Sequence, residues 1–150
     1  MFDLLPAMLV AQSDGLGDGR IDNVIIDRSV HLSLGVAVLV TMTVAAGLVL
    51  RNAIHNVGAD KATYWAIGIA QVVLGAQILL GIKLLDQGQG IGQLYIHYVG
   101  GLIPMGAFLA GGWVARGNTG RSSRILAVLL GIGYVSALMA FFIGQAYVNR

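Results

Sequence analysis

The chain has 150 residues, of which 57% are hydrophobic and only 11% charged, and its mean hydropathy is +0.80. Nine basic and seven acidic side chains could not cover the water-facing surface of a soluble domain of this size, so the composition predicts an integral membrane protein. The absence of cysteine excludes disulfides, thiolate metal sites and cysteine nucleophiles, and a net charge of +2 is too small and scattered to indicate a nucleic-acid partner.

Residues 1–29 precede the first long apolar stretch, and most of their charged side chains are acidic. The apolar run from Leu4 to Ala11 is too short to cross a bilayer, and it lacks the basic residues that precede the core of a secretory signal. We therefore interpret residues 1–29 as an extracytoplasmic segment that lies at the membrane interface.

Four apolar stretches follow, each long enough for the roughly 20 residues that span a hydrocarbon core. They are residues 30–50, 64–85, 94–115 and 125–148, and short polar connections separate them. Short connections make neighbouring helices antiparallel, and open strands are excluded in lipid because their backbone groups would lack hydrogen-bond partners. Residues 30–150 are therefore predicted to form an all-α transmembrane domain, an up-down-up-down bundle of four helices.

The distribution of basic residues predicts the orientation of this bundle. The connection between the first two spans carries Arg51 and Lys61, and the connection between the last two carries Arg116, Arg121 and Arg124. The positive-inside rule places both connections in the cytoplasm and both chain ends outside. The sequence thus predicts a multi-pass protein of the cell membrane, that is, of an inner or cytoplasmic membrane.

Two histidines are the strongest candidates for binding a cofactor. His31 opens the first span and His97 lies one turn into the third, and an arginine follows them after 20 and 19 residues respectively. Both histidines should therefore lie at one depth, near the outer face. The first and third helices of a cyclic antiparallel bundle run parallel and lie diagonally across the core. Facing imidazoles there could bind both axial positions of one heme b iron, so His31 and His97 are predicted metal ligands.

Three further residues belong to this predicted site. Gly35 and Gly101 each follow a histidine by four residues, on the same helix face, and leave a notch where a flat macrocycle could approach the backbone. Arg28 is available to a heme propionate. The repeated pattern hints at a duplicated helical hairpin. The alternative for each histidine is an interfacial side chain that hydrogen-bonds to water, lipid headgroups or backbone.

The other polar residues offer little chemistry. His55 lies in the first cytoplasmic connection and is interpreted as a solvated loop residue. Gln71 and Gln77 lie in the second span, where they either join helices by hydrogen bonds or contact a quinone or heme edge. No span has an acidic residue at its middle, which argues against proton-coupled transport. The sequence contains no catalytic constellation of nucleophile and base, paired carboxylates or phosphate-binding loop.

One part of the chain resembles a known family. The run from Gln71 to Gly81, a short loop and the run from Ile96 to Gly101 resemble a piece of one half of heme A synthase, over about a fifth of the chain. The resemblance implies a four-helix unit that binds a b-type heme between histidines, with His97 at the matching position. That family places its histidines on the second and fourth helices of each half, so the similarity extends only to heme-carrying cytochrome b bundles in general.

Three classes of function remain open. The first is an accessory or structural subunit of a respiratory or photosynthetic electron-transfer complex, with or without one b-type heme near the outer face. The second is a stand-alone membrane b-type cytochrome that exchanges electrons with quinone. The third is a small-molecule transporter or membrane enzyme. The expected partners are the lipid bilayer, other membrane-protein subunits and, if heme is bound, quinone.

Overall fold

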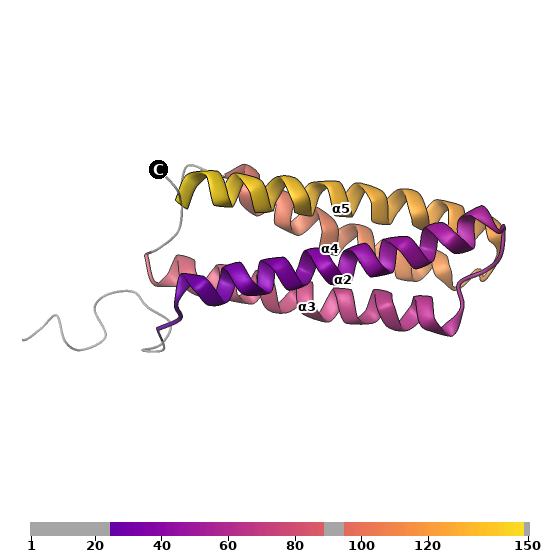
Figure 1. Cartoon of the computed structure of the whole chain (residues 1–150), viewed down its shortest axis with the longest axis horizontal. Coiled ribbons are helices and arrows are strands. Elements are labelled where there is room, and N and C mark those ends of the chain that lie inside the picture. The colour runs from indigo at the N-terminus through magenta and orange to yellow at the C-terminus, as the bar shows by residue number, and fades with distance from the viewer. Residues whose placement is uncertain (1–24, 89–94, 149–150) are drawn as a thin grey trace, which may run out of the picture.

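The computed structural model describes residues 25–88 and 95–148, which form four long helices (Figure 1). The helices are α2 (Arg28–Ile54), α3 (Lys61–Asp86), α4 (Tyr95–Ala115) and α5 (Gly120–Val148). Each is long and apolar enough to cross a membrane. The predicted all-helical transmembrane bundle is therefore confirmed, while residues 1–24 of the predicted interfacial segment lie outside the described residues.

Polar caps extend the helices beyond the apolar stretches. The carboxylate of Asp27 accepts a hydrogen bond of 2.7 Å from the backbone N–H of Ser29 at the start of α2. Asp60 accepts one of 2.8 Å from the backbone N–H of Thr63 at the start of α3. Aspartate is a preferred residue for this position because its oxygen satisfies an N–H group that has no partner within the helix.

The four helices are arranged cyclically. Helix α2 packs beside α3 and α5, helix α4 packs beside the same two helices, and α2 and α4 lie diagonally across the bundle (Figure 1). The pair α4–α5 packs most closely, followed by α2–α3 and α2–α5. The pair α3–α4 makes the fewest close approaches of the four neighbouring pairs, so this seam is the least closed side of the bundle.

Apolar side chains fill the core and also cover the outer surface of the bundle. Buried positions recur every three or four residues over residues 35–52 of α2, 63–74 of α3, 104–115 of α4 and 123–140 of α5. The largest buried apolar side chains are Phe108, Met42, Leu126, Leu130 and Val49. Outward positions are just as apolar, and they include Val40, Val72, Leu79, Leu109, Val128 and Phe142. A surface of this kind is stable in contact with lipid rather than water.

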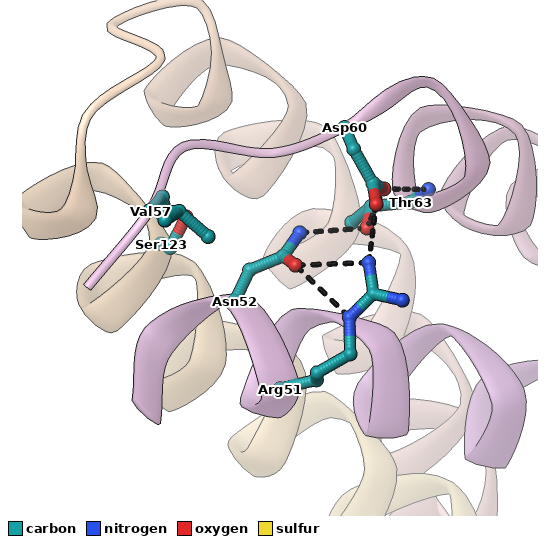
Figure 2. Close-up of polar contacts among 6 residues, drawn as sticks. All are labelled: Arg51, Asn52, Val57, Asp60, Thr63 and Ser123. Atoms are coloured by element: carbon teal, nitrogen blue, oxygen red, sulfur yellow. Dashed lines mark hydrogen bonds and ion pairs between the residues drawn. The ribbon is translucent and has the colours of Figure 1, made fainter. Parts of the chain in front are cut away.

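A polar network closes the α2–α3 hairpin at the end that carries the two short connections (Figure 2). The buried amide of Asn52 donates to the hydroxyl of Thr63 over 2.8 Å and accepts two hydrogen bonds from the guanidinium of Arg51. The same guanidinium forms an ion pair with Asp60. This network satisfies polar groups that would otherwise be costly to bury.

Two hydrogen bonds tie the hairpins together at the same end. The hydroxyl of Ser123 on α5 donates to the carbonyl of Val57 over 2.7 Å, a contact that lies beside the α2–α3 network in Figure 2. The phenol of Tyr64 on α3 donates to the carbonyl of Ala115 on α4 over 2.8 Å. Both bonds hold one hairpin to the other.

The two connections also contact each other directly. Each contains the pattern Asn-x-Gly, at positions 56–58 and 118–120, and each asparagine has a positive φ, 54° for Asn56 and 41° for Asn118. A Cβ atom on Gly58 would lie 2.5 Å from the carbonyl oxygen of Asn118, and one on Gly120 would lie 2.3 Å from that of Asn56. Both glycines are therefore required by a close, reciprocal approach of two backbones.

Candidate cofactor site

The opposite end of the bundle brings together the two histidines that the sequence singled out. His31 lies in the first turn of α2 and His97 in the first turn of α4. Although these helices are diagonal, the centroids of the two imidazole rings are only 6.4 Å apart, with an angle of 63° between the ring planes. Both side chains are half-buried. The bundle thus places two potential metal ligands opposite each other across its core.

His97 is held in a defined orientation by α5. Its Nδ1 lies 2.8 Å from the carbonyl oxygen of Ala140. Because a carbonyl oxygen only accepts, Nδ1 carries the hydrogen, and in the neutral ring Nε2 then presents a lone pair. The ring also lies against Gly144, where a Cβ atom would be 3.1 Å from Cε1. A histidine that ligates a metal through one nitrogen commonly donates its other N–H to such a carbonyl.

His31 is held differently. Its Nε2 lies 3.1 Å from the amide nitrogen of Gln77 on α3. Within the part of the chain that the structure describes, His31 Nδ1 and Gln77 Oε1 are both buried without a hydrogen-bond partner. Flipping the side-chain amide of Gln77 exchanges its oxygen and nitrogen. One buried polar atom on each of the two residues still lacks a partner. Each buried polar atom without a hydrogen-bond partner costs about 1–3 kcal/mol of stability. The site therefore contains two polar atoms whose hydrogen bonds the described residues do not provide.

A glycine packs against each of the two rings, and the ring of Tyr98 also lies beside His97, with the ring centroids 5.6 Å apart. A Cβ atom on Gly81 would lie 3.4 Å from Cε1 of His31, just as Gly144 lies against His97. Each ring therefore faces a glycine on the other helix of its own hairpin. A Cβ atom on Gly100 would lie 3.3 Å from the Cβ of Ala140, which shows how closely α4 and α5 approach at this level.

The glycines predicted to form the notch lie elsewhere. Gly35 is buried, and a Cβ atom there would meet the Gln77 amide nitrogen at 3.3 Å and the Phe141 ring at 3.4 Å. A Cβ atom on Gly101 would have no neighbour within 4 Å among the described residues. Gly35 thus borders the site through Gln77, whereas Gly101 does not lie against either ring.

The remaining predicted residues are placed as follows. Arg28 is the first residue of α2, three residues before His31, and is exposed. His55 is exposed at the far end of α2, so it does not join the other two histidines. Across residues 25–88 and 95–148, no group of three or more His, Asp or Glu side chains could hold a metal ion.

Three observations bear on whether the residues at this end can hold a heme. Imidazole nitrogens bind first-row metals at about 2 Å, so a nitrogen of each ring would have to point at one iron across the 6.4 Å that separates the ring centroids. The bond to Ala140 leaves Nε2 of His97 available as a ligand. One glycine lies against each ring, and the adjacent α3–α4 seam is the least closed side of the bundle. For His31 to bind iron through Nε2, this nitrogen must leave Gln77.

Several residues of the site were not predicted as such. Gln77 was predicted only as either a link between helices or a contact of a quinone or heme edge. Gly81 and Gly144 were expected to allow close helix approach and were not assigned to the site, and Ala140 was not assigned to it either. One signal could have identified the glycines: Gly81 lies 23 residues after the glycine of the first Asn-x-Gly pattern, and Gly144 lies 24 after the second. No protein family, curated protein or solved structure matches the chain, so the resemblance to heme A synthase rests on the quoted residues alone.

Proposed function

We propose that this chain is a membrane subunit of an electron-transfer complex and carries one b-type heme between His31 and His97. The observation that supports this proposal most directly is the 6.4 Å separation of two imidazole rings from diagonal helices. The orientation of His97 by the Ala140 carbonyl adds to it, because such a bond is typical of histidine ligands. A stand-alone cytochrome is the nearest alternative.

Each residue has a separate role in this proposal. His97 and His31 would hold the iron, and the exposed guanidinium of Arg28 at the start of α2 would pair with a propionate. Heme, when bound, supplies one-electron redox chemistry. The helices account for almost all of the described residues, so in this proposal electrons would pass to a partner subunit or a quinone near this end of the bundle.

We further infer that the histidine end faces the outside of a cell membrane. The structure collects five basic residues at the opposite end: Arg51, Lys61, Arg116, Arg121 and Arg124. The positive-inside rule assigns such an end to the cytoplasm. The heme would then lie close to the extracytoplasmic surface, and both chain ends would be outside.

A cofactor-free accessory subunit is the second candidate. It is favoured by the large apolar side chains that face outward on all four helices, since these can pack against other subunits as well as against lipid. This candidate needs no ligand at the histidine end.

Titration of the purified, heme-free chain with hemin in detergent distinguishes these candidates. We expect the wild-type chain to bind one heme with a b-type spectrum, and His97→Ala to lose at least tenfold in affinity. His31→Ala should lose the spectrum of a heme with two histidine ligands. His55→Ala is the matched control and should bind like the wild type, because its side chain lies at the other end of α2. Equal binding by all four proteins would refute the assignment of the ligands.

A further inference from the structure

Two exposed cations lie on either side of the α3–α4 seam, at the end of the bundle that carries the short connections. Lys61 is the first residue of α3 and precedes Tyr64 by three positions, so the two side chains share a helix face. The phenol of Tyr64 donates to the carbonyl of Ala115 over 2.8 Å, and Arg116 is the next residue of the chain. The hydrogen bond that crosses the seam thus has one cation beside each of its ends.

These two cations are not neutralised by a described acidic side chain. Asp60 is the one acidic residue in the two short connections. Its carboxylate accepts hydrogen bonds from Thr63 and forms an ion pair with Arg51. Within the part of the chain that the structure describes, neither Lys61 nor Arg116 takes part in an ion pair. The surface at this seam is therefore positive and complementary to an anion.

The exposed side chains one turn nearer the middle of the bundle are aromatic. Trp65 follows Lys61 by four residues, and Trp113 precedes Arg116 by three, so each indole lies beside a cation on its own helix. Trp65 is 65% exposed and Trp113 is 74% exposed. Tryptophan is enriched at membrane interfaces because its ring contacts acyl chains while its N–H meets polar headgroup atoms. The surface therefore suits an amphipathic ligand with an anionic end.

We propose that Lys61 and Arg116 bind the phosphate of an anionic phospholipid whose acyl chains lie along the α3–α4 seam. A guanidinium fits phosphate with two parallel hydrogen bonds, and Lys61 adds a second positive charge. A zwitterionic lipid is less complementary, because its headgroup carries a cation of its own. This seam is the least closed side of the bundle, and a Cβ atom on Gly68, one turn beyond Tyr64, would meet nothing within 4 Å among the described residues.

Native mass spectrometry of the purified chain in detergent measures this binding directly. The probes are dioleoylphosphatidylglycerol, which is anionic, and dioleoylphosphatidylcholine, which is zwitterionic, each in a separate titration. We expect the wild type to bind the anionic lipid about tenfold more tightly than the zwitterionic one. Lys61→Gln and Arg116→Gln should each weaken binding of the anionic lipid about five- to tenfold, because each removes a charge-assisted hydrogen bond to the phosphate.

Arg121→Gln is the matched control. Arg121 is also an exposed cation at this end of the bundle, but it lies on α5, which packs beside α2 and α4 and, among the described residues, not beside α3. Its replacement changes the net charge by the same amount as the two test variants. It should bind the anionic lipid like the wild type.

Three results would overturn the proposal. Equal losses of affinity in all three variants would show that net charge alone attracts the lipid. Equal affinity of the wild type for the two lipids would show that the cations do not select a headgroup. Displacement of the anionic lipid by inorganic phosphate, but not by chloride at equal ionic strength, would assign the cations to free phosphate. The site lies at the end of the bundle opposite the histidines, so these results are independent of whether heme is bound.

Discussion

Gly144 lies directly against the imidazole of His97, across the interface of α4 and α5. A Cβ atom at position 144 would be 3.1 Å from Cε1 and 3.3 Å from Nδ1, which is the nitrogen that donates to Ala140. This contact leaves no space for a methyl group unless the ring turns. The glycine therefore maintains the orientation in which His97 presents Nε2.

The first prediction concerns this glycine. Gly144→Ala should push the His97 ring away from Ala140, which should destabilise the bundle by about 1–3 kcal/mol and weaken heme binding. Gly131→Ala on the same helix is the control, because a Cβ atom there meets nothing within 4 Å among the described residues. Thermal unfolding in detergent and hemin titration measure the two effects. Equal behaviour of the two variants would show that the ring has room to adjust.

The second prediction concerns the contact between the two connections. Gly58→Ala and Gly120→Ala should each lower the free energy of unfolding by about 1–3 kcal/mol, because the added methyl group meets backbone rather than a flexible side chain. Gly68→Ala, whose Cβ position is open, serves as the control. Unfolding of the three variants in detergent provides the comparison. An unchanged Gly120→Ala protein would contradict the close approach of the two backbones.

The third prediction is a dependence of stability on pH. Hydrogen bonds from the Thr63 hydroxyl and backbone N–H, followed by the interaction with Arg51, lower the pKa of Asp60 from 3.8 to about 2. A carboxyl whose pKa is lowered on folding stabilises the protein above the unfolded value, and this stabilisation is lost as the pH falls through the folded value. Asp60→Asn should therefore be less stable than the wild type at neutral pH.

The difference between these two proteins should shrink as the pH falls from 3.8 to about 2, where the wild-type carboxyl becomes protonated. Thermal unfolding of both proteins across this range is the measurement. A difference that stays constant down to pH 2 would indicate that the negative charge of Asp60 contributes nothing to stability.

The fourth prediction concerns orientation. The chain has no native cysteine, so a single introduced thiol reports its location without interference. In intact cells, a membrane-impermeant thiol reagent should label Ile25→Cys and leave His55→Cys unlabelled, since the basic end should lie in the cytoplasm. Both positions are exposed in the structure. Labelling of His55→Cys alone would reverse the inferred topology.

Much of the fold follows directly from composition and length. Four long apolar stretches and short polar connections suffice to predict four antiparallel helices, because a bilayer leaves few alternatives for a polar backbone. The helix ends were less predictable: α2 was expected to end at Leu50 but continues to Ile54. The polar residues Arg51 and Asn52 remain helical because Asp60 and Thr63 satisfy them across the hairpin.

The sequence predicted the depth of the two histidines in the membrane, but not which face of each helix points toward them. Counting residues from the arginines placed His31 and His97 at one level. Identifying their neighbours requires knowing which face of each helix points inward, and these helices are apolar on all faces, so periodicity gives little guidance. The glycines at the rings were therefore assigned to positions 35 and 101, whereas the rings lie against Gly81 and Gly144 on the other helix of each hairpin.

The central claim is that His31 and His97 hold a heme, and a reduced-minus-oxidised absorption spectrum of the chain purified from its native membrane tests it most directly. The proposal predicts the spectrum of a b-type heme, present at about one heme per chain. A featureless spectrum from the folded protein would contradict the proposal and leave a structural subunit that binds no heme.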